Sequence, residues 1–129
     1  MPQTFALSRY GQLLVCKAEV TGPQATRHLA LLLDTGSNYT VIATESLEAA
    51  GCRTATQRDY IRITTAGGVV FAPRLRTQVL TFFDRRMTDA EVIAYDLPFT
   101  GPIDGLLGMD LLVALRARID VAGAQIELP

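Results

Sequence analysis

Short apolar runs separated by turn-forming residues dominate this chain. Alternating or continuous apolar patterns of this kind, bounded by Gly, Pro, Asn and Asp, are typical of β-strands. The strands predicted in this way are residues 13–20, 27–33, 40–43, 60–64, 69–72, 75–83, 87–95, 118–121 and 125–128. The continuous run Leu31-Leu32-Leu33 indicates that its strand is buried on both faces.

Two segments have helical rather than strand character. At residues 44–51, Thr44 is a suitable N-cap, acidic residues occupy the first turn and Gly51 is a suitable stop. Residues 109–115 predict a second short helix. Many short strands with one or two short helices indicate an all-β domain that is either a closed barrel or sandwich-like.

Three turns connect neighbouring strands of this pattern. The strongest is Thr65-Ala66-Gly67-Gly68, because glycine adopts positive φ angles without strain. Asp84-Arg85-Arg86 predicts the tip of a longer hairpin between strands 75–83 and 87–95, and Ala122-Gly123-Ala124 joins the last two strands. The first turn has two interpretations: a tight β-turn, or a mobile flap over a binding site.

The composition favours one soluble globular domain covering residues 1–129. The chain has 49% hydrophobic and 19% charged residues, which excludes a disordered polypeptide. A net charge of −1 gives no electrostatic basis for binding nucleic acid or an anionic membrane surface. No apolar run is long enough to span a membrane, and the N-terminus lacks the pattern of a secretory signal. We therefore expect a cytoplasmic location, unless an anchor or export segment has been removed.

The cysteines and the histidine offer little chemistry. Cys16 and Cys52 are too few for a disulfide framework and, with only His28 beside them, have no zinc-binding spacing. A Cys–His nucleophile is one interpretation; two buried hydrophobes and a surface histidine at the start of a strand are the other, and the second is preferred. We expect no metal and no cofactor.

The stretch LLLDTGSNYTVI, residues 31–42, is the first element with catalytic potential. Asp34 ends a buried strand, where a carboxylate is costly unless it is hydrogen-bonded, paired or functional. Gly36 would allow a backbone N–H group to point at that carboxylate, and Thr35 and Ser37 add hydroxyl groups. Such tetrapeptides are frequent in surface turns, but a surface turn is not normally bracketed by apolar runs.

A second element, residues 103–109, alternates apolar residues with glycine before the predicted helix. By itself it is compatible with a helix entry that uses glycine for close packing. In this order and spacing, however, the segments Leu33-Asp34-Thr35-Gly36-Ser37, 65–68 and 106–112 together resemble the retropepsin-like aspartic proteases. These are single-domain relatives of pepsin found in retroviruses and encoded by bacteria. The run 104–110 is similar to bacterial and Ddi-like members.

The resemblance covers residues 13–128 and implies a closed, barrel-like acid-protease fold that cleaves peptide or protein substrates. That chemistry needs two carboxylates sharing one proton. The chain supplies one Asp-Thr-Gly triplet, and neither Asp104 nor Asp120 begins a second one. The resemblance therefore implies a homodimer in which each copy contributes Asp34.

The resemblance also assigns roles to individual residues. The catalytic residues would be Asp34, Thr35 and Gly36, and the substrate-binding residues would be Ser37, Thr65, Ala66, Gly67 and Gly68. Terminal strands near residues 3–7, within the first ten residues, and near residues 124–128 would build the dimer interface. Asn38 departs from the family pattern, which has a small apolar or hydroxyl residue there.

Two alternatives remain open from the sequence. Segments of the form Asp-x-Gly also bind phosphate in the actin and sugar-kinase superfamily, although that fold needs two domains and several hundred residues. The other alternative is a catalytically silent retropepsin-like module for dimerisation or peptide binding. The intact Asp34-Thr35-Gly36 triplet argues against this loss of activity without excluding it.

Overall fold

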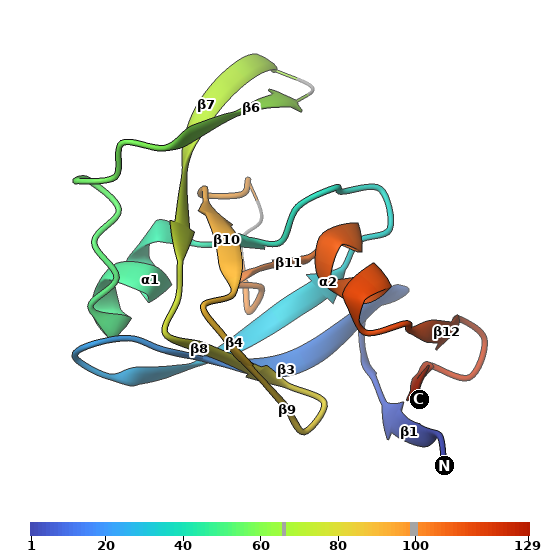
Figure 1. Ribbon diagram of the computed structural model, residues 1–129. Helices are drawn as coiled ribbons and strands as arrows, with labels where there is room; N and C mark the ends of the chain where they lie inside the picture. Colours follow the sequence, from blue (N-terminus) through green and yellow to red (C-terminus); the bar gives the residue numbers. More distant parts are fainter. Residues whose placement is uncertain (66, 99–100) are drawn as a thin grey trace.

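The computed structural model describes residues 1–65, 67–98 and 101–129. In this part of the chain, two short helices accompany a large curled sheet and a smaller three-stranded sheet (Figure 1). The helices are α1 (Thr44–Ala50) and α2 (Met109–Ala114). The strands are β1 (Gln3–Ala6), β2 (Ser8–Tyr10), β3 (Leu13–Thr21), β4 (Thr26–Leu33), β5 (Val41–Ile42), β6 (Tyr60–Thr65), β7 (Gly68–Arg76), β8 (Val79–Phe82), β9 (Arg85–Thr88), β10 (Glu91–Ala94), β11 (Gly105–Leu107), β12 (Arg118–Asp120) and β13 (Gln125–Leu128).

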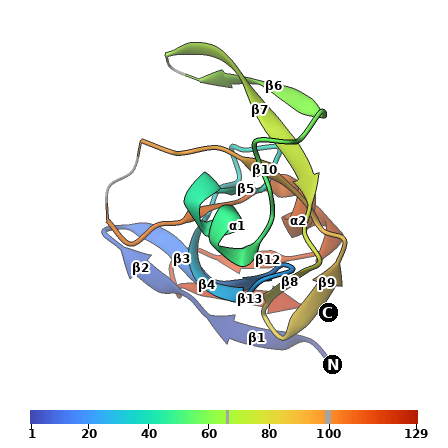
Figure 2. The same cartoon turned by 90° about the vertical axis from the view of Figure 1, so that its left-hand side faces the viewer.

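The large sheet has the order β6-β7-β10-β5-β11-β4-β3-β8-β9, and β2 pairs with β3 at its side. It curls strongly, so that the strands form half a barrel around the core, and the β6–β7 hairpin projects away from the body (Figures 1 and 2). The predicted all-β, barrel-like fold with two short helices is confirmed. No helix of the described residues is long and apolar enough to cross a membrane.

Strand β11 lies between β4 and β5, although more than sixty residues of sequence separate it from both. It runs parallel to β4, with Leu107 opposite Leu33, and antiparallel to β5. Only glycine fits at position 105, because a Cβ atom there would clash with the backbone carbonyl of Val41. Residues 103–109 were interpreted from the sequence as the start of a helix that uses glycine for close packing. They in fact include the central strand β11, which was not predicted.

Two clusters of buried side chains fill the fold. The larger lies between the sheet and α1, and includes the fully buried Leu31, Ile42 and Leu47. The smaller consists of Val15, Leu32, Val41, Ala72, Ile93 and Leu106. Because successive residues of β4 enter different clusters, the strand is buried on both faces, as the Leu31–Leu33 run predicted.

The predicted pairing of 75–83 with 87–95 is confirmed in one continuous register, in which Leu75 lies opposite Val92 and Leu80 opposite Met87. Each of the two predicted strands is interrupted, however: β7 ends at Arg76 and pairs with β10, whereas β8 pairs with β9 and with β3. The break occurs where the Thr77 N–H donates to the Ala90 carbonyl and Asp89 adopts a φ of 54°. The hairpin turn consists of Phe83 and Asp84, with φ angles of 51° and 56°, so the predicted turn residues Arg85 and Arg86 belong to β9.

The N-cap predicted for the first helix was also wrong. Ala43 is the N-cap of α1 and forms no side-chain cap. The Asp96 carboxylate, which follows β10, accepts a hydrogen bond from the Thr44 N–H instead (2.9 Å). The predicted stop is confirmed, because Gly51 has a φ of 93° and its N–H donates to Glu48.

The smaller sheet brings the two ends of the chain together, as both views show (Figures 1 and 2). Its order is β1-β13-β12, and all neighbouring strands are antiparallel. Strands near both termini were predicted, but not their pairing with each other. Because β13 lies in the centre of this sheet, both of its edges are hydrogen-bonded to strands of the same chain, β1 and β12.

Candidate active site

Asp34 lies directly after β4, at the point where the chain turns out of the barrel. Asp34 is half-buried, and its backbone N–H donates to the Leu107 carbonyl on β11 (3.0 Å). The Gly36 N–H donates to Asp34 Oδ1 (2.9 Å). The predicted hydrogen bond between this glycine and the carboxylate is therefore present.

Gly36 leaves little space around the carboxylate. A Cβ atom at this position would lie 3.2 Å from Asp34 Oδ1, closer than ordinary van der Waals contact. Thr35, by contrast, is exposed. Because Gly36 has no side chain, its backbone amide can approach the Asp34 carboxylate, while the neighbouring Thr35 remains accessible.

The rest of the loop is tied to the segment that leads into α2. The Ser37 hydroxyl donates to the Tyr39 carbonyl (2.7 Å) and accepts from the Tyr39 N–H (3.3 Å), so it stabilises the loop itself. The Met109 N–H donates to the Ser37 carbonyl (2.8 Å), and the Asp110 N–H donates to the Asn38 carbonyl (3.3 Å). The segment after β11 therefore supports the loop along its length.

A buried polar network closes the loop at Thr40. This residue is fully buried, and its hydroxyl donates to Asp110 Oδ1 (2.8 Å) while accepting from the Gly108 N–H (3.1 Å). The Thr40 and Leu111 N–H groups also donate to the Asp110 carboxylate, at 3.1 and 2.8 Å. Sequence reasoning missed this network, although a threonine inside an apolar run and an aspartate at a helix start were its visible signals.

Asp34 opens into a cleft of about 490 Å³, here called the Asp34 cleft. Loop residues form one wall, the β6 strand of the projecting hairpin another, and apolar residues of β5, β11 and the segment after β10 a third. The lining residues are Asp34, Gly36, Ser37, Asn38, Tyr39, Val41, Arg62, Ile63, Thr64, Tyr95, Leu97 and Leu106. Asp34 is the one carboxylate among them.

Of the predicted hairpin residues, Gly67 and Gly68 do not line the Asp34 cleft. Thr65 ends β6, and Gly67 and Gly68 are exposed at the turn, where Gly68 has a φ of 121°. Ala66 lies outside the described residues. The hairpin residues that line the Asp34 cleft are Arg62, Ile63 and Thr64, which carry no signal of their own in the sequence.

The carboxylates judged unsuitable as a second catalytic acid have structural partners. Asp104 Oδ2 accepts from the Ala30 N–H (2.8 Å), and Asp120 Oδ1 accepts from the Gly123 N–H (2.9 Å). Neither residue lines the Asp34 cleft. Within the described part of one chain, Asp34 therefore has no second carboxylate in the cleft.

The cysteines and the histidine behave as the sequence suggested. Cys16 and Cys52 are buried free thiols, and burial raises the pKa of the Cys16 thiol to about 12. His28 lies on the surface beside its cross-strand neighbour Glu19, with 3.3 Å between the imidazole and the carboxylate. Among the described residues, no cluster of His, Cys, Asp or Glu could hold a metal ion.

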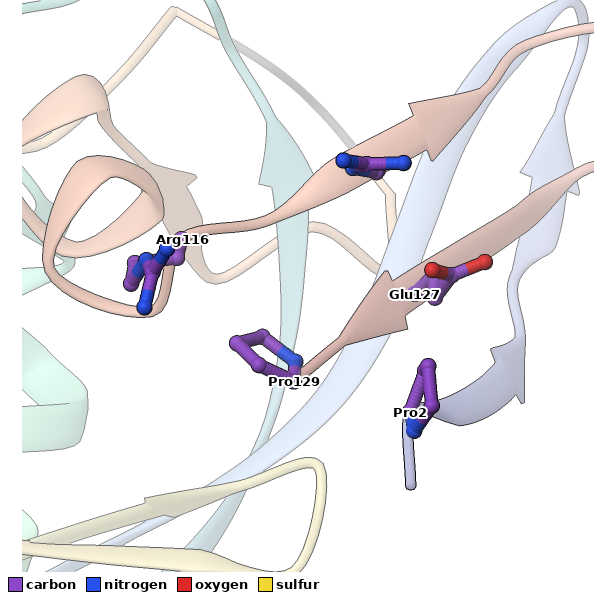
Figure 3. A pocket seen from close by; sticks show the side chains of 5 residues that line it. Pro2, Arg116, Glu127 and Pro129 are labelled. Atoms are coloured by element: carbon purple, nitrogen blue, oxygen red, sulfur yellow. The ribbon is translucent and has the colours of Figure 1, made fainter.

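Other hollows lie outside the Asp34 cleft, and two of them lie beside the C-terminal segment. One, of about 230 Å³, lies over the smaller sheet and is lined by Pro2, Arg116, Arg118, Glu127 and Pro129 (Figure 3). The other, of about 400 Å³, is here called the Thr35 groove. It is lined by Thr35, Met109, Leu112, Val113, Arg116, Ala117 and Ile119. The Thr35 groove connects Thr35 of the Asp34-Thr35-Gly36 triplet to α2 and β12.

Comparison with known proteins adds independent information. The sequence model of a family described as aspartyl protease matches residues 16–111. Among solved structures, a retropepsin-like aspartic protease from Rickettsia conorii is similar, with a TM-score of 0.72 and 19% sequence identity. The match covers 99% of this chain and 91% of that one, and at this identity it concerns the fold. No curated protein sequence matches significantly.

Proposed function

Since this chain belongs to the retropepsin-like aspartyl protease family, we propose that it is an endopeptidase whose catalytic pair consists of Asp34 from two identical copies. The observation that carries the proposal is the Asp34 carboxylate itself. It lines the cleft, accepts the Gly36 N–H, and has no second carboxylate beside it within the described part of one chain. A single carboxylate cannot serve as both base and acid in one step, so a second copy must complete the site.

The chemistry follows from two carboxylates that share one proton. The ionised carboxylate removes a proton from a water molecule as that water attacks the peptide carbonyl, while the protonated carboxylate donates to the carbonyl oxygen. Transfer of a proton to the amide nitrogen then allows the C–N bond to break. The two groups titrate as one unit, because two neighbouring carboxylates that share one proton repel each other when both are ionised.

Each copy would contribute the same supporting groups. The Gly36 amide holds the carboxylate, and the exposed Thr35 hydroxyl is available to the partner's loop. Ser37, Thr65, Ala66, Gly67 and Gly68 remain the proposed substrate contacts, to which the cleft adds Arg62, Ile63 and Thr64 of the same hairpin. In this role the β6–β7 hairpin is a flap that covers the peptide and excludes water.

The substrate is proposed to be an extended peptide with apolar or aromatic side chains near the cleaved bond. The third wall of the Asp34 cleft is apolar, with Val41, Tyr95, Leu97 and Leu106. Such a wall gains free energy from burying apolar substrate side chains. Mixed peptide libraries would identify the preference by mass spectrometry of the products.

The decisive experiment compares the wild type with Asp34→Asn in peptide cleavage between about pH 3 and pH 7, the range in which a carboxylate pair shares one proton. Asp96→Asn is the matched control, because Asp96 is also a carboxylate that accepts one backbone N–H (2.9 Å) but lies outside the Asp34 cleft. We expect cleavage by the wild type and the control and none by Asp34→Asn. Equal behaviour of all three proteins towards every peptide would refute the proposal.

The alternative of a catalytically silent module predicts a different result. Such a module would form dimers or bind peptides without cleaving them, and Asp34→Asn would leave both properties unchanged. The Gly36 N–H bond to Asp34 favours the enzyme, because a binding module has no need to hold a single carboxylate in the wall of its cleft.

A further inference from the structure

The edge of strand β3 that faces away from β4 is interrupted. Along this edge, residues 13–15 pair with β2 and residues 18–21 pair with β8. Between these two stretches, Cys16 and Lys17 have no strand partner on this side in the described part of the chain. This two-residue gap in the sheet is here called the β3 notch.

The backbone groups of Lys17 face the β3 notch. Hydrogen-bonded and non-hydrogen-bonded pairs alternate along an antiparallel pair of strands. The Gly22 N–H donates to the Ala25 carbonyl (3.0 Å) where the β3–β4 hairpin closes, so every second residue from there continues the hydrogen-bonded set, which includes the pair of Cys16 and Leu31. Lys17 belongs to the other set. Its N–H and carbonyl groups therefore point away from β4, into the notch.

A cavity of about 360 Å³ lies at the notch and is here called the Lys17 pocket. Its apolar lining consists of Phe5 and Ala6 of β1, Cys16 of β3, and Phe83 of the turn after β8. The Phe5 and Phe83 rings pack together with 5.5 Å between their centroids, and Cys16 and Phe83 are buried. The polar lining residues Ser8, Lys17 and Asp84 are all exposed. The pocket thus has an aromatic floor and a polar mouth.

The mouth carries two opposite charges that are not paired with each other. Lys17 is the one lysine of the sequence, and Asp84 occupies the turn before β9 with a φ of 56°. Among the described residues, neither Lys17 nor Asp84 takes part in an ion pair. A ligand that has one anionic and one cationic group would therefore match both side chains.

We propose that the Lys17 pocket binds a free α-amino acid with an aromatic side chain. Its carboxylate pairs with the Lys17 ammonium group and accepts from the Lys17 N–H, while its ammonium group pairs with Asp84 and donates to the Lys17 carbonyl. Its ring packs against Phe5 and Phe83. The volume of the pocket is in the range of small-molecule sites. The inference is independent of the proposed function, because the Lys17 pocket and the Asp34 cleft have no lining residue in common.

The test begins with L-phenylalanine and two analogues, titrated into the full chain by calorimetry. L-phenylalanine amide lacks the carboxylate, and N-acetyl-L-phenylalanine lacks the ammonium group. Each analogue should bind about tenfold or more weakly than L-phenylalanine, because each loses one charge-assisted pair. L-alanine should bind more weakly as well, because it has no ring to pack against the aromatic floor.

Two variants connect each charged group of the ligand to its partner. Lys17→Gln should weaken the binding of L-phenylalanine about tenfold and leave that of the amide unchanged. Asp84→Asn should weaken the binding of L-phenylalanine to the same degree and leave that of the N-acetyl compound unchanged. Asparagine tolerates a positive φ, so this variant keeps the turn.

The matched controls are Arg27→Gln and Asp89→Asn. Arg27 is an exposed basic residue on the neighbouring strand β4, and Asp89 is an exposed carboxylate whose φ of 54° resembles that of Asp84. Neither residue lines the Lys17 pocket. Both variants should bind L-phenylalanine like the wild type.

The single lysine also allows a direct observation of contact. Reductive methylation with ¹³C-formaldehyde keeps the charge of Lys17 and gives it one side-chain signal in the NMR spectrum. This signal should shift as L-phenylalanine is added, and it should shift less with the amide.

The outcomes decide the inference without affecting the Asp34 pair. Weakened binding that follows the charge removed, with intact controls, would support it. Binding that survives Lys17→Gln would place the amino acid elsewhere, such as in the Asp34 cleft, and would overturn it. Equal binding of the N-acetyl compound would indicate the C-terminal residue of a peptide instead, and would overturn the assignment of a free amino acid, as would a lack of binding at millimolar concentrations. Peptide cleavage by the wild type is expected in each of these cases if the proposed function is correct.

Discussion

Removal of the Asp110 carboxylate should destabilise the protein far more than its exposed position suggests. In Asp110→Ala, three N–H or O–H donors lose their acceptor: the Thr40 N–H, the Thr40 hydroxyl and the Leu111 N–H. Water can replace the carboxylate at Leu111, in the first turn of α2, because Asp110 is exposed. It cannot easily do so at Thr40, which is 0% exposed.

The magnitude follows from the two buried donors. Each costs about 1–1.5 kcal/mol when it is left without a partner, so we expect a loss of about 2–3 kcal/mol in the free energy of unfolding. For a chain of this size, that corresponds to a fall in Tm of roughly 8–12 °C. Because the Thr40 network closes the loop after Asp34, kcat should also fall more than KM rises, at temperatures where the variant is folded.

The assay is urea unfolding of four proteins: the wild type, Asp110→Ala, Thr40→Val and the double variant. Thr40→Val removes the hydroxyl and leaves the Gly108 N–H without its acceptor, which costs about 2 kcal/mol. The double variant should be about 1 kcal/mol more stable than additivity predicts, since the two side chains share a hydrogen bond.

Asp96→Ala provides the control, because it removes a carboxylate that accepts a single N–H at the start of the other helix. We expect it to cost about 1 kcal/mol, as for the loss of a helix cap. The reasoning is refuted if Asp110→Ala costs no more than Asp96→Ala, or if the double variant is simply additive.

Three further predictions concern single positions. Gly36→Val should abolish peptide cleavage while lowering Tm only slightly, because its side chain would displace the Asp34 carboxylate; parallel loss of both would indicate a purely structural glycine. Gly105→Ala should prevent folding or cost at least about 3 kcal/mol, measured by circular dichroism, because the added methyl group would meet the Val41 carbonyl; a variant of wild-type stability would contradict this. The pKa of the Cys16 thiol is about 12 in the folded chain and 9.0 for an ordinary thiol, so folding keeps the proton bound and stability falls as pH rises from about 9 towards 12, by up to about 1.4 kcal/mol per pH unit. Urea unfolding of Cys16→Ala at pH values on both sides of 9.0 should lack this component, and an unchanged slope would show that the thiol does not contribute.

Local patterns in the sequence predicted most strands, both helices and the position of the Asp34-Thr35-Gly36 loop at the end of a buried strand. These features depend on neighbouring residues: the Leu31–Leu33 run required burial on both faces, and Gly51 required a left-handed helix end. The hydrogen bond from Gly36 to Asp34 could be expected for the same reason, since it spans two residues.

Features that depend on distant residues were not predictable. Strand β11 contains only Gly105, Leu106 and Leu107, too few residues to show a period, and it becomes a strand because β4 and β5 lie on either side. The Asp96 cap of α1 spans 52 residues, and the Asp110–Thr40 contact spans 70. The interruption within the 75–95 hairpin was not predicted, because it accompanies the pairing of β8 with the distant strand β3.

The central place of β11 has a consequence for the growing chain on the ribosome. Strands β4 and β5 are synthesised long before residue 105 emerges, so until then the edges that face β11 have no partner. The Asp34 loop likewise lacks the Leu107 carbonyl, the Met109 amide and the Asp110 carboxylate that hold it. Nearly all of the polypeptide must therefore be made and folded before the Asp34 loop takes its shape. Under the proposed function, a nascent or truncated chain would therefore carry the complete Asp-Thr-Gly triplet without the folded loop that cleavage requires.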